Sequence, residues 1–464
     1  MVFLLASFMA FRQFLDMGSS LAFFTFLSQR QRSARFVAIF GYWVGLQFLV
    51  ALALVSVALP DFLIARIWVG ESRSLMVLAL LATFMQGTVW TIASQMAEAS
   101  RETIRVQRLN TLVVLIHLGA VLALWWLSQL AIPFIFAALA AEWAVAGWVA
   151  ARMYRTHDSS QAVESVPMDT PGSVWREFMA YCLPLIPYTW LGFAHDFADR
   201  WMLQNWGGAK EQAYYGVAQQ FAAVALLATS SILRIFWKEI AEAHHNGDIP
   251  RVRRLYRKVS RMLYFAGAAM AGGLLPWAAE ILQLTAGTAY AGGAVTLMLM
   301  FIYPVHQSMG QIGGTMLYAT GHVRIQVVLG IVFMAISLVT AYFMMAPADA
   351  PIPGLAMASQ GLAWKMVLLQ VVGVNVTAWF VARLFDWRLD WLYQVGGLLG
   401  CVGMGWLANF LVTYHLAGLQ SIIVQMAVAG IVYVGLIMAL IYALPGLTGL
   451  SRLELGGYIR RWLG

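Results

Sequence analysis

Charged residues and cysteine are both scarce in this chain. Of its 464 residues only 11% are charged and two are cysteines, whereas 61% are hydrophobic. Soluble proteins are roughly 45–50% apolar and about 25% charged, so this composition excludes an ordinary soluble domain. Cys182 and Cys401 both lie in apolar runs, which indicates neither a disulfide framework nor a metal site. With a mean hydropathy of +0.74, the composition predicts an integral membrane protein.

Catalytic and nucleotide-binding motifs are also missing. The sequence has no phosphate-cradling glycine loop, no His-Glu-x-x-His, no nucleophile elbow and no Asp-x-Asp. ATP hydrolysis by this chain is therefore excluded on motif grounds, and we expect no cofactor and no enzymatic activity. A membrane-embedded polysaccharide polymerase or glycosyltransferase, the enzyme alternative, would present a sizeable outer loop with catalytic residues, whereas the outer connections are all short.

Long apolar runs dominate what is present. A bilayer core needs about 20 mostly apolar residues per helix, and thirteen runs reach that length. The predicted fold class is an all-α integral membrane protein with about thirteen transmembrane helices. The runs cover residues 3–27, 36–59, 76–97, 110–131, 132–151, 178–203, 213–236, 260–285, 292–318, 324–346, 354–382, 393–414 and 419–444.

Lysine and arginine predict the orientation, because basic residues accumulate on cytoplasmic connections. Most of the 29 basic residues fall on alternate connections if the N-terminus lies outside and the C-terminus in the cytoplasm. This placement accounts for the net charge of +8 without nucleic acid. The densest basic segment, residues 251–261, is either an anchor for this topology or a binding site for anionic lipid.

A charged pair interrupts the first apolar run, within "AFRQFLDMGSS" at 10–20. A charge at mid-bilayer costs about 2.5–3.5 kcal/mol on insertion scales, so such residues usually face a bundle interior or a wet cavity. Arg12 and Asp16 share a helix face, which Ser19 and Ser20 extend. We interpret this face as the polar wall of a translocation path, where Arg12 attracts an anionic headgroup and Asp16 holds it in position. The alternative is a structural ion pair between helices.

Three further titratable residues lie within predicted spans. Glu142 is isolated among small apolar residues and is either a proton carrier or a hydrogen-bond partner between helices. Lys365 is the only lysine within a span, and we interpret it as a cavity cation for diphosphate or sugar. Its alternative is a structural partner of Glu142 or Asp16. His306 follows Pro304 and is a candidate for ion or proton coupling, although a lone histidine in a span is more often structural.

A polar cluster lies at the outer end of the sixth predicted span. It contains His195, Asp196, Asp199 and Arg200. These residue types suggest a metal site, but no second histidine or cysteine follows at a recognisable spacing. We therefore expect no metal and interpret the cluster as a rim network that tethers two lobes.

The order of the spans suggests an internal repeat. The first span and the seventh both carry a serine pair past the middle and then enter a charged inside loop. This pattern predicts a first lobe of five spans at 1–151, a cytoplasmic linker at 152–177 and a second lobe of six spans at 178–388. Two more spans and a basic cytoplasmic tail occupy 389–464.

Three segments resemble polysaccharide flippases of the Wzx type. Residues 195–267 carry an Asp-Arg pair at a span end, a glycine-bearing turn, a Tyr-Gly span, and an A-x-x-x-G-D loop before a basic run. Residues 14–29 resemble the second span of that family, and 284–326 resemble its ninth-to-tenth span region. The likeness covers residues 1–445, and the superfamily concerned is the multidrug/oligosaccharidyl-lipid/polysaccharide exporters.

The resemblance implies a fold and a function. The family has two six-helix lobes around a central cavity that opens alternately to each side, and this chain starts at the family's second helix. Asp199 and Arg200 match the family's Asp-Arg pair.

The implied activity is flipping of an isoprenoid-diphosphate-linked oligosaccharide across a bacterial inner membrane, as in O-antigen synthesis. An ion or proton gradient would drive it, with Asp16, Glu142 or His306 as carriers. Polysaccharide polymerase and chain-length proteins are implied partners beside membrane lipids. A cation-coupled multidrug exporter of the same superfamily is the alternative.

Overall fold

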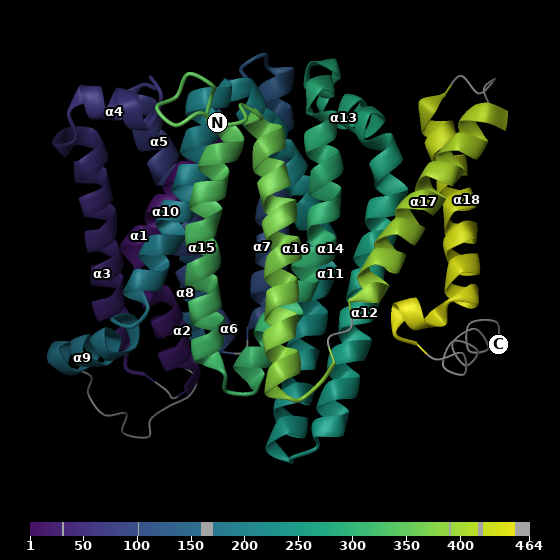
Figure 1. Cartoon of the computed structure of the whole chain (residues 1–464). Coiled ribbons are helices and arrows are strands. Elements are labelled where there is room, and N and C mark those ends of the chain that lie inside the picture. Colours follow the sequence, from purple (N-terminus) through teal and green to yellow (C-terminus); the bar gives the residue numbers. More distant parts are fainter. Residues whose placement is uncertain (30–31, 101, 159–169, 389–390, 416–420, 451–464) are drawn as a thin grey trace. The chain divides into compact units, whose positions relative to one another are not determined.

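The computed structural model describes residues 1–29, 32–100, 102–158, 170–388, 391–415 and 421–450. Every regular element within them is helical, as the composition predicts (Figure 1). The helices form two compact units, unit 1 at Met1–Asn205 and unit 2 at Trp206–Gly464. The middle of the predicted linker, 159–169, and the basic tail, 451–464, lie outside the described residues.

Ten of the thirteen predicted spans coincide with helices long and apolar enough to cross a membrane. Among the described residues these are Ala34–Ala58, Arg73–Ala99, Thr103–Trp126, Ile132–Tyr154, Ile249–Ala286, Thr288–Ala319, Val323–Met345, Ala358–Leu384, Leu392–His415 and Ile422–Ala443. The other three predicted spans correspond to α1 with α2, to α10, and to α11. These helices contain Arg12 and Asp16, the cluster at 195–200, and Lys210 with Glu211.

Unit 1 packs around its first helix. Large apolar side chains of α1, among them Phe3, Leu4 and Phe8, form a core with Met76 of α5 and Phe136 of α8. Along the chain the elements are α1 (Val2–Asp16), α2 (Ser19–Gln29), α3 (Ala34–Ala53), η1 (Leu54–Ala58), α4 (Asp61–Ile67), α5 (Arg73–Phe84), η2 (Met85–Val89), α6 (Trp90–Ala99), α7 (Thr103–Trp126), α8 (Ile132–Asp158), α9 (Pro171–Cys182) and α10 (Ile186–Met202). Both η1 and η2 are π-helical turns within longer helices.

The sixth predicted span is shorter than expected, and the reason is proline. Instead of one helix from 178, the chain forms α9 and then α10, which begins at Ile186 with a proline in its first turn. Pro184 lies in the turn between them, where its missing N–H prevents a continuous helix. Figure 1 shows α9 lying across one end of unit 1 rather than along its helices.

Helix α10 packs against α1, although the sequence-based division assigned 178–203 to the second lobe. Phe14 stacks on Trp190 with 5.3 Å between ring centroids and contacts Phe193 at 5.1 Å. Gly192 faces the Gln13 amide so closely that an added Cβ would lie 2.8 Å from Nε2. Within the described part of unit 1, α10 therefore supplies a sixth long helical segment beside α1–α2, α3, α5–α6, α7 and α8.

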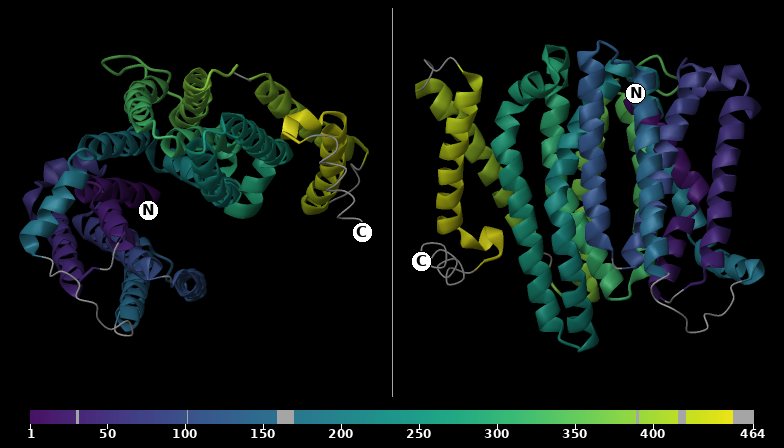
Figure 2. Two further views of the ribbon diagram at one scale, coloured as in Figure 1. Left: turned by 90° about the horizontal axis from the view of Figure 1, so that it is seen from below. Right: turned by 180° about the vertical axis from the view of Figure 1, so that it is seen from behind.

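Unit 2 is built from longer, mostly continuous helices. After the π turn η3 (Leu203–Gly207) come α11 (Gly208–His245), α12 (Ile249–Leu274), η4 (Leu275–Trp277), α13 (Ala278–Ala286), η5 (Thr288–Gly293), α14 (Ala294–Ala319), α15 (Val323–Met345), α16 (Ala358–Leu384), α17 (Leu392–His415), α18 (Ile422–Ala443) and η6 (Pro445–Thr448). Figure 2 shows α17 inclined between α12 and α18. Tyrosine hydroxyls connect these three helices: Tyr264 donates to Gln394 O at 3.1 Å and Tyr433 to Ala269 O at 2.6 Å.

Candidate functional site

The charged pair in the first span lies at a break in the helix. Helix α1 ends at Asp16, and Met17 (φ 50°) and Gly18 (φ 83°) adopt the left-handed conformation before α2 begins at Ser19. The Asp16 carboxylate caps the new helix. Its Oδ1 accepts hydrogen bonds from Ser20 N at 3.0 Å, Ser20 Oγ at 2.5 Å and Ser19 Oγ at 3.1 Å. Asp16 therefore satisfies donors that the break exposes.

Side chains of α3 add two hydrogen bonds at this break. Gln47 Nε2 donates to Leu15 O at 2.9 Å, and Trp43 Nε1 donates to Ser19 Oγ at 3.2 Å. In a membrane such partners are needed because lipid cannot hydrogen-bond to a free backbone group. Discontinuous helices of this kind form the substrate and ion sites of many transporters.

Arg12 does not pair with Asp16. Among the described residues no ion pair joins them within 4.0 Å; instead Arg12 Nη1 donates to Gly87 O at 2.7 Å. Gly87 lies in the π turn η2, where the altered hydrogen-bond ladder frees carbonyl groups, and π turns are frequent at functional sites. An added Cβ here would lie 3.1 Å from Arg12 Cδ and Nε, so a larger residue would require the Arg12 side chain to shift by a few tenths of an ångström.

The Arg12 guanidinium keeps unused donors. Its Nε is buried and has no hydrogen-bond partner within the described part of the chain. Thr88 on the same π turn is buried, and its Oγ1 likewise has no partner there. A buried charged donor without an acceptor is costly, so this part of unit 1 is electrostatically suited to an incoming anion.

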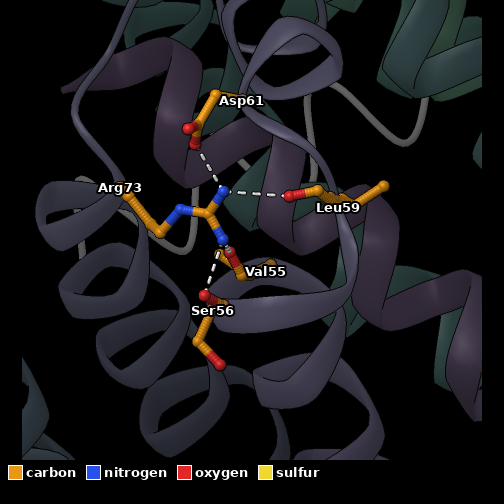
Figure 3. A network of polar contacts seen from close by, with 5 residues as sticks. All are labelled: Val55, Ser56, Leu59, Asp61 and Arg73. Carbon is orange, nitrogen blue, oxygen red and sulfur yellow. Dashed lines mark hydrogen bonds and ion pairs between the residues drawn. The ribbon is translucent and has the colours of Figure 1, made fainter.

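A second arginine bonds to the other π turn through both of its terminal nitrogens (Figure 3). Arg73 Nη1 donates to Ser56 O at 2.6 Å, and Nη2 donates to Leu59 O at 2.9 Å and pairs with Asp61 Oδ1 at 2.6 Å. It closes η1 and the turn into α4, so its role in the structure is to hold the end of α3. No motif in the sequence indicates this network.

Glu142 contacts His117, which was not among the candidate site residues. His117 Nδ1 of α7 lies 2.8 Å from Glu142 Oε2 of α8. Helix α7 is otherwise largely exposed, so this pair links an apolar outer helix to the bundle. The contact is the hydrogen bond between helices that one interpretation of Glu142 expected. It also joins two titratable groups, so it leaves the proton-carrier hypothesis open.

The predicted outer cluster comes together on α10. His195 Nδ1 lies 3.0 Å from Asp196 Oδ1, and His195 Nε2 lies 3.8 Å from Asp199 Oδ2. Asp199 and Arg200 are both buried. No group of three or more His, Cys, Asp and Glu side chains that can hold a metal occurs in the described part of the chain.

The two candidates of unit 2 are both buried. Lys365 of α16 is only 1% exposed, which is exceptional for a lysine. His306 of α14 is 4% exposed, and its Nε2 lies 3.3 Å from the Tyr264 hydroxyl. Tyr264 follows the basic segment on α12, and no sequence pattern connects it with His306.

Two polar networks of unit 2 were missed at the level of sequence. The Glu211 carboxylate accepts from Ser359 N at 3.2 Å and from Ser359 Oγ, which contacts Thr296 Oγ1 at 3.0 Å. Asn375 of α16 and Gln394 of α17 exchange two amide hydrogen bonds at 3.0 and 3.2 Å. Their only signal was a polar side chain at the start or in the interior of an apolar run.

Comparison with known proteins identifies the fold. No family model and no curated protein matches the sequence. The solved structure of the lipid II flippase MurJ, inward closed, matches with a TM-score of 0.70 at 12% identity, over 96% of this chain and 93% of that one.

Two other transporter structures match less extensively. An outward-facing multidrug resistance MATE family transporter of the MOP superfamily matches with a TM-score of 0.55 at 12% identity, over 82% of this chain and 85% of that one. A MOP superfamily transporter from Pyrococcus furiosus matches with a TM-score of 0.53 at 12% identity, over 83% and 85%. The chain therefore has the fold of the multidrug/oligosaccharidyl-lipid/polysaccharide exporters.

Proposed function

We propose that this protein is a flippase for an isoprenoid-diphosphate-linked oligosaccharide in a bacterial inner membrane. The fold comparison supports this class, because the match to the lipid II flippase covers nearly the whole of both chains. The Wzx-type resemblance of residues 14–29, 195–267 and 284–326 favours an oligosaccharide-lipid for surface polysaccharide synthesis.

The observation that carries the proposal is the bonding of Arg12. A purely structural arginine in a membrane uses its donors on protein acceptors, as Arg73 does. Arg12 uses one donor on Gly87 O and retains a buried Nε without a partner among the described residues. Diphosphate oxygens are strong acceptors for a guanidinium, and the bonds they form are charge-assisted.

The mechanism follows as alternating access. The diphosphate binds at Arg12, Lys365 supplies a second cation for the headgroup, and the isoprenoid tail stays in the bilayer. The Asp16 cap holds the helix break that presents Arg12. Glu142 with His117, and His306 with Tyr264, are the titratable pairs through which a proton gradient is coupled. The N-terminus is outside and the C-terminus in the cytoplasm, and the polymerase and chain-length proteins act on the flipped product.

One observation favours the multidrug exporter as the second candidate. A pocket of about 560 Å³ in unit 1, almost entirely apolar, lies between α3 and α9 with Trp43, Phe178 and Cys182 among its walls and Asp16 at its edge. Its size is within the range of drug sites, about 300–1,000 Å³. An amphipathic cation would combine the apolar walls with the Asp16 carboxylate.

The test uses the native host with the gene deleted, in a background that tolerates the loss. Polyprenyl-diphosphate-linked oligosaccharides are quantified by mass spectrometry after complementation with wild type, Arg12→Gln or Arg66→Gln. Arg66 is exposed on α4 and serves as the charge-matched control. We expect one repeat unit to accumulate, and wild type and Arg66→Gln but not Arg12→Gln to clear it.

The opposite pattern distinguishes the alternatives. If no lipid-linked sugar accumulates in the deletion strain and the strain becomes sensitive to lipophilic cations, the multidrug exporter replaces the flippase. If sugar accumulates and Arg12→Gln clears it like wild type, the flippase remains and Arg12 loses its role.

A further inference from the structure

A second polar site lies in unit 2, on the basic segment of α12. Three of its arginines and one residue after α16 line a pocket of about 300 Å³: Arg253, Arg257, Arg261 and Arg388. The pocket is bounded by Tyr256, Trp387 and Tyr393 and reaches the buried Ser260. None of the described residues that line it is acidic.

The spacing of these arginines explains why they converge. Arg253, Arg257 and Arg261 follow one another at intervals of four residues, which places them on one face of α12. Their neighbours in the same segment do not join them. Arg251 pairs with Glu239 at 2.7 Å, and Arg254 is exposed and does not line the pocket. A topology anchor requires only that basic residues be present. Here three of the arginines also share the helix face that lines the pocket.

Contacts within the pocket hold part of the cluster in place. Arg261 Nη1 donates to Gly446 O at 2.5 Å, and its guanidinium lies 5.0 Å from the centroid of the Tyr393 ring. Arg253 and Arg388, by contrast, are exposed, and no hydrogen bond or ion pair of theirs is found within the described residues. Like charges at this spacing repel each other, so an anion between them relieves the repulsion.

The size and the position of the pocket limit the ligand. About 300 Å³ is at the lower end of ligand sites, so it suits a headgroup rather than a whole oligosaccharide or drug. The pocket lies where the basic turns of α12 pass into its apolar part, which begins after Arg261. Arginine forks match the geometry of phosphate oxygens, and aromatic rings beside them are typical of such sites.

We infer that this pocket binds a phosphate group, carried either by an acidic membrane lipid or by a soluble anion. The inference does not depend on the transported substrate, because no residue of the pocket belongs to the translocation site proposed above. A phosphate bound in this pocket bridges α12 and Arg388, which lies after α16.

The test measures binding by the purified full-length protein in detergent. One arm uses native mass spectrometry with phosphatidic acid and, for comparison, phosphatidylcholine. The other uses equilibrium binding of radiolabelled inorganic phosphate. The variant is Arg253→Gln with Arg388→Gln. Its matched control is Arg254→Gln with Arg324→Gln, two exposed arginines of unit 2 that do not line the pocket.

The expected loss is about fivefold in affinity for each arginine, the ratio that corresponds to about 1 kcal/mol per basic residue near a membrane surface. The pocket variant therefore loses tens of fold and the control stays near wild type. Loss in the lipid arm alone identifies a lipid headgroup, and loss in the phosphate arm identifies a soluble anion. Equal affinities for pocket variant and control overturn the inference. Arg388→Gln alone, outside any helix, repeats the test if the double variant does not fold.

Discussion

Two arginines of unit 1 serve π turns in different ways. Arg73 binds the carbonyls around η1 and pairs with Asp61, so both terminal nitrogens of its guanidinium are bonded by the protein. Arg12 reaches η2 with a single hydrogen bond to Gly87 O, and its buried Nε is left without a partner in the described structure. Arg73 therefore stabilises its π turn as a structural residue, whereas Arg12 retains a donor that a ligand could use.

This difference gives a criterion for charges in membrane spans. Arg12 lies within an apolar run, where burial of its charge costs free energy, whereas Arg73 lies just before the run at 76–97 and its side chain is 32% exposed. A structural arginine and a ligand-binding arginine then differ in whether the protein itself supplies the hydrogen-bond acceptors. Arg73 lies at the start of α5 and finds carbonyls at a helix end, whereas Arg12 lies in the interior of α1 and finds one.

The largest effect on stability is expected for Arg73→Gln. The carbonyls of Val55, Ser56 and Leu59 would lose their donor, and net losses of about 0.5–1.5 kcal/mol per hydrogen bond predict about 2–3 kcal/mol overall. The exposed Asp61 adds little, because exposed ion pairs contribute at most about 1 kcal/mol. Denaturant unfolding of the purified protein measures the loss, and transport per folded molecule should be unchanged. Stability equal to wild type would show that Arg73 does not stabilise the end of α3.

Gly87→Ala should cost about 1–2 kcal/mol, since overpacking of a tight contact has this order of cost. The added Cβ meets Arg12 Cδ and Nε at 3.1 Å, so the Arg12 side chain must shift by a few tenths of an ångström, which strains its hydrogen bond to Gly87 O. Gly41→Ala is the matched control, because nothing lies within 4 Å of a Cβ there. If both glycine variants unfold alike, the close approach of Arg12 to η2 is not important for the fold.

Asp16→Ala should destabilise by about 1 kcal/mol, the usual cost of a lost helix cap. Asp16→Asn keeps an acceptor oxygen for Ser19 and Ser20 and should cost only a few tenths of a kcal/mol. The pair of variants separates the cap from the charge. If Asp16→Asn unfolds as readily as Asp16→Ala, the negative charge itself is what stabilises the break.

The smallest change in stability is expected for Arg12→Gln. The variant loses one hydrogen bond, worth about 1 kcal/mol, and is relieved of a buried charge, so the two contributions largely cancel. The midpoint of thermal unfolding should lie within a few degrees of wild type. A loss of stability as large as that of Arg73→Gln would make Arg12 a structural residue as well. The proposed difference between the two arginines would then be wrong.

Composition and spacing predicted most of the fold. The apolar runs located ten spans because length and hydropathy alone decide whether a helix can cross a bilayer. Such runs cannot show where a helix breaks. The turn at Asp16, Met17 and Gly18 depends on a cap and a left-handed glycine, and these were interpreted as one face of a continuous helix.

The site was less predictable than the fold, because several of its partners are distant in sequence. Arg12 and Asp16 were found from their cost in a membrane, and the donors to Asp16, Ser19 and Ser20, are close in sequence. The acceptor of Arg12 lies on η2, and the α3 side chains that bond to Leu15 and Ser19 are also far along the chain. The arginines at 253, 257 and 261 were visible as a basic segment. Their convergence with Arg388 and Tyr393 required the packing of α12 against its neighbours. Periodicity gives the face of a helix and leaves open what that face meets.

The most direct test of the account is flipping by the purified protein. Wild type, Arg12→Gln and Arg66→Gln are reconstituted in vesicles with a polyprenyl-diphosphate oligosaccharide, and a membrane-impermeant enzyme modifies the outer-leaflet sugar. We predict that wild type and Arg66→Gln expose the inner-leaflet pool to the enzyme, while Arg12→Gln leaves it protected as in protein-free vesicles. Protection by all three proteins would contradict flippase activity, and equal exposure by all three would contradict the role assigned to Arg12.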